Sequence, residues 1–66
     1  SIAWYYGEIL RDRRKELKIT QQELAEKVGT ARSYIARVEK GETDIQISSF
    51  FRIARALGIE FTPTFL

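Results

Sequence analysis

The chain of 66 residues contains no cysteine and no histidine. Their absence excludes disulfides, zinc sites built from cysteine and histidine, and catalysis by a thiol or an imidazole. A lack of cysteine also fits a reducing compartment, so we expect a cytoplasmic, nucleoid-associated protein. Because so short a chain buries only a thin core, self-association is the reinforcement that remains available.

Long apolar runs and clustered glycines are also missing. No run approaches the roughly 18 residues that span a membrane, and we expect neither a signal peptide nor a membrane partner. The glycines form no phosphate-binding cluster. The one carboxylate pair at helical spacing, Asp12 and Glu16, lies among arginines and is interpreted as solvated ion pairs. We therefore expect no enzyme, no cofactor, no metal site and no small-molecule substrate.

Basic residues are concentrated in one stretch, although the net charge is only +2. Between residues 11 and 18 five of eight are basic, namely Arg11, Arg13, Arg14, Lys15 and Lys18. Many of the acids lie in other segments, such as Glu42, Asp44 and Glu60. A localised basic surface is typical of a protein that binds a polyanion. A solvent-exposed helix face without a partner is an equal alternative.

Apolar spacing predicts an all-α fold with helices at about residues 4–17, 20–28, 31–40 and 48–57. Thr20 and Glu23 have the spacing of a capping box that opens the second helix. Gly29, Gly41 and Gly58 are expected to end the last three helices. The predicted core consists of Leu10, Leu17, Ile19, Leu24, Val28, Ile35, Val38, Ile47, Phe50, Ile53 and Leu57.

The C-terminal segment has a different period. Apolar and polar residues alternate from Ile59 onward, which predicts a short strand at about residues 60–65. Pro63 limits this strand to an edge or to pairing on one side. The chain offers no second convincing strand as its partner.

The second and third helices form the most informative unit. They are joined only by Gly29-Thr30-Ala31, and so short a connection predicts a steep crossing. The third helix would bury Ile35 and Val38 and turn its basic residues outward. An α-helix fits the major groove of B-DNA, and its N-terminal residues reach the base edges.

Three segments resemble the phage-repressor (Cro/XRE) helix-turn-helix family. They are residues 20–30 (TQQELAEKVGT), 34–41 (YIARVEKG) and 53–59 (IARALGI). The resemblance covers about residues 7–59 and implies a four-helix, lambda-repressor-like domain across residues 1–66, with the predicted strand appended. Residues 29–48 are also similar to antitoxin regulators of host-inhibition toxin–antitoxin operons.

The resemblance also implies roles for individual residues. Arg32, Ser33 and Arg37 match base-reading positions, with a solvated or phosphate-bound arginine as the alternative. Gln21, Tyr34 and Lys40 match phosphate contacts, Lys40 together with the amides after Gly41. For Tyr34, packing against the second helix is an equal alternative. Arg14 and Glu39 match a structural salt bridge.

At the position before Arg32 the family usually has a Ser or Thr cap, and here it is Ala31. We expect either that Thr30 caps the third helix instead or that its first turn frays until DNA phosphate satisfies its amides.

The predicted function is sequence-specific binding of a double-stranded DNA operator by a homodimeric transcriptional regulator, an autorepressor. The alternative is an antitoxin whose main role is to bind and neutralise a toxin protein, and RNA binding is a third hypothesis. The lone strand makes residues 60–66 the expected dimer interface, with pairing between the two copies. Dimerisation through the fourth helices is the alternative. The expected interface residues are Phe61, Thr62, Pro63, Thr64 and Phe65.

Overall fold

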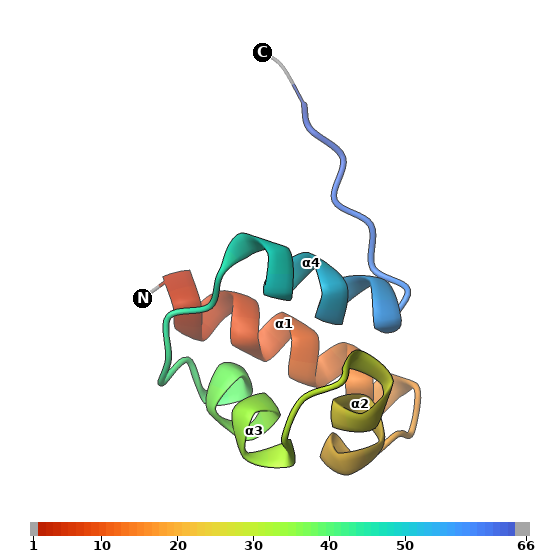
Figure 1. Cartoon of the computed structure of the whole chain (residues 1–66). Helices are drawn as coiled ribbons and strands as arrows, with labels where there is room; N and C mark the ends of the chain where they lie inside the picture. Colours follow the sequence, from red (N-terminus) through yellow and green to blue (C-terminus); the bar gives the residue numbers. More distant parts are fainter. Residues whose placement is uncertain (1, 65–66) are drawn as a thin grey trace.

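The computed structural model describes residues 2–64 and confirms the four-helix all-α prediction. The helices are α1 (Ile2–Glu16), α2 (Gln21–Val28), α3 (Arg32–Lys40) and α4 (Ile47–Ala56). Figure 1 shows α1 running through the middle of the molecule, with α4 on one side and α2 and α3 on the other. Across residues 2–64, no helix has both the length and the apolar character that crossing a membrane requires.

The predicted capping box opens α2. The Thr20 hydroxyl accepts from the Glu23 amide at 3.0 Å, and the Thr20 amide donates to the Glu23 carboxylate at 2.8 Å. The bond from the Thr20 amide to the carboxylate, followed by the interaction of the Thr20 hydroxyl with the same carboxylate, holds the pKa of Glu23 below its ordinary value. Because folding lowers the pKa of Glu23, its ionised carboxylate stabilises the folded state at pH values above the unfolded pKa. This stabilisation is lost as the pH falls through the folded pKa.

The ends of the helices follow the chemistry of their residues. Gly29 and Gly41 end α2 and α3 in the left-handed conformation, with φ of 76° and 71°. At the end of α1 the same conformation falls on Lys18, with φ of 59°. A non-glycine residue in this region carries a conformational cost, and nothing in the sequence signals it.

The core lies between the four helices. Its largest fully buried side chains are Leu10, Leu24, Ile35 and Leu57, all predicted as core. The core prediction was wrong for two other residues, since Leu17 is 40% exposed and Ile47 is 74% exposed. Leu17 follows the last residue of α1 and Ile47 is the first residue of α4, so neither has the inward orientation of a mid-helix position.

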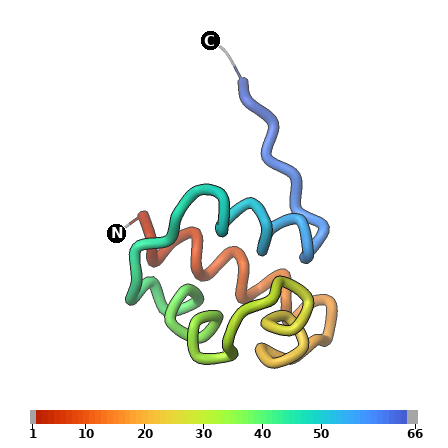
Figure 2. Tube along the Cα trace, in the orientation of Figure 1, coloured from red at the N-terminus to blue at the C-terminus, as the bar shows by residue number. Residues whose placement is uncertain are grey.

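The C-terminal segment differs from the prediction of a strand. Residues 60–64 contain no strand, and Phe65 lies outside the described residues. The tube in Figure 2 shows the segment leaving the end of α4 and extending away from α2 and α3. No second extended segment lies beside it within the described part of the chain, so no ladder of hydrogen bonds forms there.

Gly7 lies inside α1, where glycine weakens a helix by roughly 1 kcal/mol relative to alanine. A glycine is needed at this position because there is no room for a side chain. A Cβ at this position would lie against the carbonyl oxygen of Val38 and 2.9 Å from that of Glu39. Gly7 therefore lets α1 approach the backbone at the end of α3.

We expect Gly7→Ala to destabilise the protein by about 1–3 kcal/mol in a urea melt, because the close approach to α3 outweighs the gain in helix propensity. Gly29→Ala is the comparison, since a Cβ there meets nothing within 4 Å and any loss comes from the backbone conformation alone. A more stable Gly7→Ala protein would contradict the close approach of α1 and α3.

Candidate nucleic-acid interface

The exposed side of α3 is presented by a short turn and a buried opposite side. Ile35 and Val38 lie in the core, at 1% and 5% exposure. The side chains left at the surface belong to Arg32, Ser33, Arg37 and Lys40. The outward face of α3 is therefore polar and positively charged along its length.

The first turn of α3 has no side-chain cap. Ala31 is the N-cap residue, in an extended conformation, and α3 begins at Arg32. The expected cap by Thr30 is absent, because Ala31 occupies the N-cap position and no side chain caps the helix. The helix is formed without a cap, with the Ala31 carbonyl accepting from the Tyr34 amide at 3.0 Å. The first amides of α3 are thus open to an acceptor from outside, for which the positive end of the helix dipole is favourable.

Arg14 and Glu39 meet between α1 and α3 as a two-pronged ion pair. Arg14 Nε donates to Glu39 Oε2 at 2.6 Å and Nη2 donates to Oε1 at 3.1 Å. The remaining terminal nitrogen, Nη1, donates to the Ile19 carbonyl oxygen at 2.9 Å. Only 10% of the Arg14 side chain and 3% of the Glu39 side chain is exposed. The pair is therefore buried, and each charge depends on the other.

Gln21 extends this pair toward the exposed face. Its side-chain nitrogen donates to Glu39 Oε1 at 3.0 Å, and its side-chain oxygen accepts from Arg32 Nη1 at 2.7 Å. The phosphate contact predicted for Gln21 follows from the family resemblance, and no pattern in the sequence indicates these two bonds. Residues that face one another from α2 and α3 cannot be paired from spacing along the chain.

Tyr34 and Arg37 lie next to one another on α3. The Arg37 guanidinium carbon is 6.0 Å from the centre of the Tyr34 ring, within the range of a cation–π contact. Tyr34 is half-buried and packs against the core cluster. The Tyr34 ring therefore lies between the core cluster and the guanidinium of an exposed arginine.

The end of α3 leaves Lys40 exposed but uses the amides that follow it. The Gly41 amide donates to the Val38 carbonyl at 3.1 Å and the Glu42 amide donates to the Arg37 carbonyl at 3.0 Å. These two amides close the helix, so a phosphate contact beside Lys40 would use the amides beyond Glu42, and that contact stays a prediction. Lys40 itself projects from the last turn.

Of the residues expected at a dimer interface, those that the structure describes, residues 61–64, lie away from this face (Figure 1). Phe61 is 40% exposed and its ring lies 5.2 Å from that of Phe50 and 6.1 Å from that of Phe51. Thr62, Pro63 and Thr64 are exposed. The basic face of α3 is thus separate from the aromatic cluster of Phe61 with Phe50 and Phe51 at the start of the tail.

Known proteins resemble this chain over most of its length. The helix-turn-helix family matches residues 10–63. An HTH-type transcriptional regulator of Methanothermobacter thermautotrophicus is 50% identical over 52 residues, covering 79% of this chain and 75% of that protein. An immunity repressor protein of Bacillus phage phi105 is 41% identical over 54 residues, covering 82% of this chain and 38% of the repressor.

A solved structure resembles the fold as well. The restriction-modification controller protein C.AhdI from Aeromonas hydrophila aligns with a TM-score of 0.82 at 33% sequence identity. The alignment covers 88% of this chain and 84% of that one. Similarity in sequence and in fold therefore includes the α2–α3 unit described above.

We expect Arg14→Ala to lower the free energy of unfolding by about 3–5 kcal/mol in a urea melt, because it leaves Glu39 buried without its counter-charge. Arg11→Ala is the matched control. Its ion pair with Glu8 is 37–38% exposed, so the change should cost about 0–1 kcal/mol. Equal losses for the two variants would show that burial gives the Arg14 pair no special weight.

Proposed function

This chain belongs to the Cro/XRE-type helix-turn-helix family of DNA-binding transcriptional regulators, and we propose that it binds double-stranded operators as a dimer and represses transcription, including that of its own operon. The observation that carries the proposal is the exposed face of α3. The arginines of this face belong to a helix whose opposite side packs in the core. The same helix is also held by the buried ion pair of Glu39 with Arg14.

Base reading is assigned to Arg32, Ser33 and Arg37. An arginine can donate two hydrogen bonds to O6 and N7 of guanine in the major groove. Arg32 lies at the start of α3, where such a helix reaches the bases, and its bond to Gln21 restricts the directions its side chain can take. Arg37 lies on the exposed side of α3, about one and a half turns further along, and rests near Tyr34.

Phosphate contacts are assigned to Gln21, Tyr34 and Lys40. Gln21 is the first residue of α2, so a phosphate there also meets the positive end of that helix. The side-chain amide of Gln21 has two N–H donors, and Glu39 takes one of them. The second donor is the one we assign to DNA.

A dimer supplies the geometry that operator binding requires. Two copies related by a two-fold axis present two α3 helices, which must be separated by about 34 Å to enter successive major grooves. We assign the interface to Phe61, Thr62, Pro63 and Thr64, together with Phe65, paired antiparallel with their counterparts. The position of residues 61–64 away from the basic face of α3 supports this assignment, since it leaves both α3 helices free.

The antitoxin role suggested by residues 29–48 receives no support from the relatives named above, whose names describe regulators, a repressor and a controller protein. The proposal therefore stops at operator binding and includes no toxin.

Substitutions on the α3 face should separate base reading from phosphate binding. On an operator selected from a random duplex pool, we expect Arg37→Ala to lose about 1–3 kcal/mol of binding and to relax the preference at one base pair. Lys40→Ala should weaken selected and random duplexes alike, because phosphates carry no direct sequence information.

Fluorescence anisotropy on both duplexes measures these effects. Arg55→Ala, an exposed arginine of α4, removes the same charge from another helix and should leave both affinities nearly unchanged. If Arg37→Ala lowers both affinities equally, Arg37 contacts phosphate and its assignment to the bases is wrong.

A further inference from the structure

The direction in which each residue of α3 leaves the helix axis follows from the pitch of the helix. An α-helix turns by about 100° per residue, so Ala36 lies about 40° and Arg37 about 140° around the axis from Arg32. The buried residues Ile35 and Val38 lie on the opposite side, at about 300° and about 240°. Ala36 therefore belongs to the outward arc of α3 and lies between the two arginines assigned to base reading.

Ala36 has the smallest side chain on this outward face. Arg32 and Lys40 lie one turn before and one turn after it, and Arg37 follows it directly. These three long side chains are exposed, whereas Ala36 is half-buried. The middle of the face is therefore its lowest part, where a docked surface comes closest to the backbone of α3.

Both arginines are held away from Ala36. Arg32 Nη1 donates to the side-chain oxygen of Gln21 at 2.7 Å, which directs the guanidinium toward α2. The Arg37 guanidinium carbon lies 6.0 Å from the centre of the Tyr34 ring. Tyr34 itself lies about 160° around the axis from Ala36. The two guanidinium groups thus point to opposite flanks of α3, so neither lies over the methyl group of Ala36.

DNA presents one apolar group to a helix in the major groove, the C5-methyl of thymine. Alanine is one of the side chains that recognise this methyl by apolar contact, whereas arginine reads guanine. From residue 32 to residue 37 the helix rises by about 7.5 Å, close to two base-pair steps of about 3.4 Å each. One base pair therefore lies between the pairs that Arg32 and Arg37 reach, and Ala36 faces it. Ser33 lies on the same arc, but its hydroxyl serves any base and does not select one.

We propose that Ala36 is a further specificity-determining residue, which contacts the C5-methyl of a thymine in the base pair between those read by Arg32 and Arg37. The inference rests on the proposed function and names part of the operator, a T·A pair flanked by two G·C pairs in each half-site. The contact buries two methyl groups against each other and leaves no donor or acceptor unpaired. Uracil at the same position leaves a gap of one methyl group.

An operator selected from a random duplex pool supplies the test. Arg32→Ala and Arg37→Ala each relax the preference at one base pair, and the two variants thereby locate the pair between them. Synthetic duplexes then carry thymine or uracil at that pair, two bases that differ only in the methyl group. We expect the unmodified protein to bind the thymine duplex about fourfold more tightly in fluorescence anisotropy, the fold-change that corresponds to burial of one methyl group.

Ala36→Gly removes the protein's side of the contact. The ratio of thymine to uracil affinity should fall from about fourfold to equality. Because the ratio is taken within one protein, a lower folded fraction does not change it. Ala56→Gly, the same substitution at a half-buried residue of α4, should keep the ratio of the unmodified protein. A ratio that survives Ala36→Gly overturns the contact.

Cytosine methylated at C5 carries the same methyl group in modified DNA, so a further duplex has 5-methylcytosine at this pair. We expect it to bind no more tightly than the thymine duplex. Tighter binding would give the contact to methylated DNA and overturn the assignment to thymine.

The outcomes separate this inference from the proposed function. The Ala36 contact is wrong, and operator binding stands, if an operator is selected but the two arginines do not read pairs two steps apart. The same conclusion follows if the pair between them is not T·A, or if thymine and uracil are bound equally. If no duplex is selected over random DNA, the proposed function fails and the Ala36 contact fails with it.

Discussion

The positions of α1, α2 and α3 relative to one another depend on the buried pair between Arg14 and Glu39. Removing two charges from water is costly, and a buried pair is tolerated when its remaining donors and acceptors are also satisfied. Here the guanidinium also reaches the carbonyl oxygen of Ile19, and the carboxylate also accepts from Gln21. The end of α1, the start of α2 and the end of α3 are thereby joined at one point, with Gly7 allowing α1 and α3 to approach.

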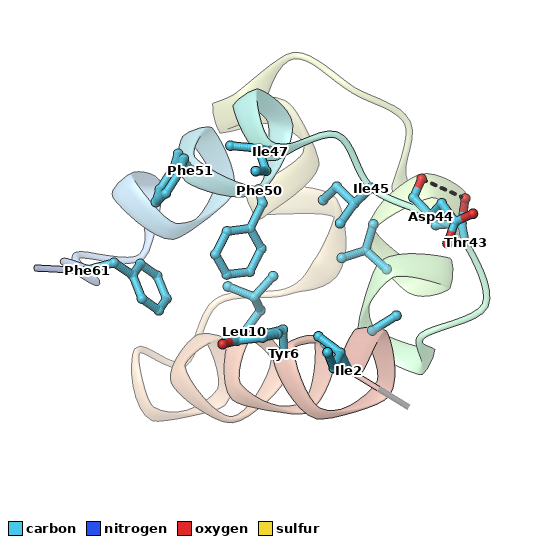
Figure 3. A pocket seen from close by; sticks show the side chains of 13 residues that line it. Ile2, Tyr6, Leu10, Thr43, Asp44, Ile45, Ile47, Phe50, Phe51 and Phe61 are labelled. Carbon is cyan, nitrogen blue, oxygen red and sulfur yellow. Dashed lines mark hydrogen bonds between the residues drawn. The ribbon is translucent and has the colours of Figure 1, made fainter. Parts of the chain in front are cut away.

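This arrangement connects the buried ion pair to the face of α3 that we assign to DNA. Glu39 holds Gln21, and Gln21 holds Arg32, so the buried pair is two hydrogen bonds away from a residue that we assign to base reading. In a short chain with a thin core, the pair adds to the packing of Ile35 and Val38 in fixing the nine-residue helix α3. Part of the apolar surface that the core does not use, including Ile2, Ile47 and Phe51, lies between α1 and α4 (Figure 3).

The sequence predicted the helices well where local chemistry decides them. The Thr20–Glu23 box and the left-handed Gly29 and Gly41 act within a few residues, so their spacing is visible in the chain. It failed for Leu17 and Ile47, which match the apolar period but lie at helix ends. It also gave no indication of the two hydrogen bonds of Gln21, because both partners come from α3. The left-handed conformation of Lys18 could not be predicted from the sequence either. The turn lacks a glycine and is stabilised by tertiary contacts, among them the hydrogen bond from Arg14 to Ile19.

The central claim is that the basic face of α3 binds the phosphate backbone of duplex DNA and positions the helix in the major groove. Its most direct test is the salt dependence of binding to a fluorescent random duplex, measured by anisotropy between low and physiological salt. Release of counterions from DNA predicts that log affinity falls linearly with log salt, with a slope of about −0.9 for each phosphate contacted. A steep negative slope is the result that the account predicts. An affinity that does not change with salt, or no binding at low salt, would contradict it.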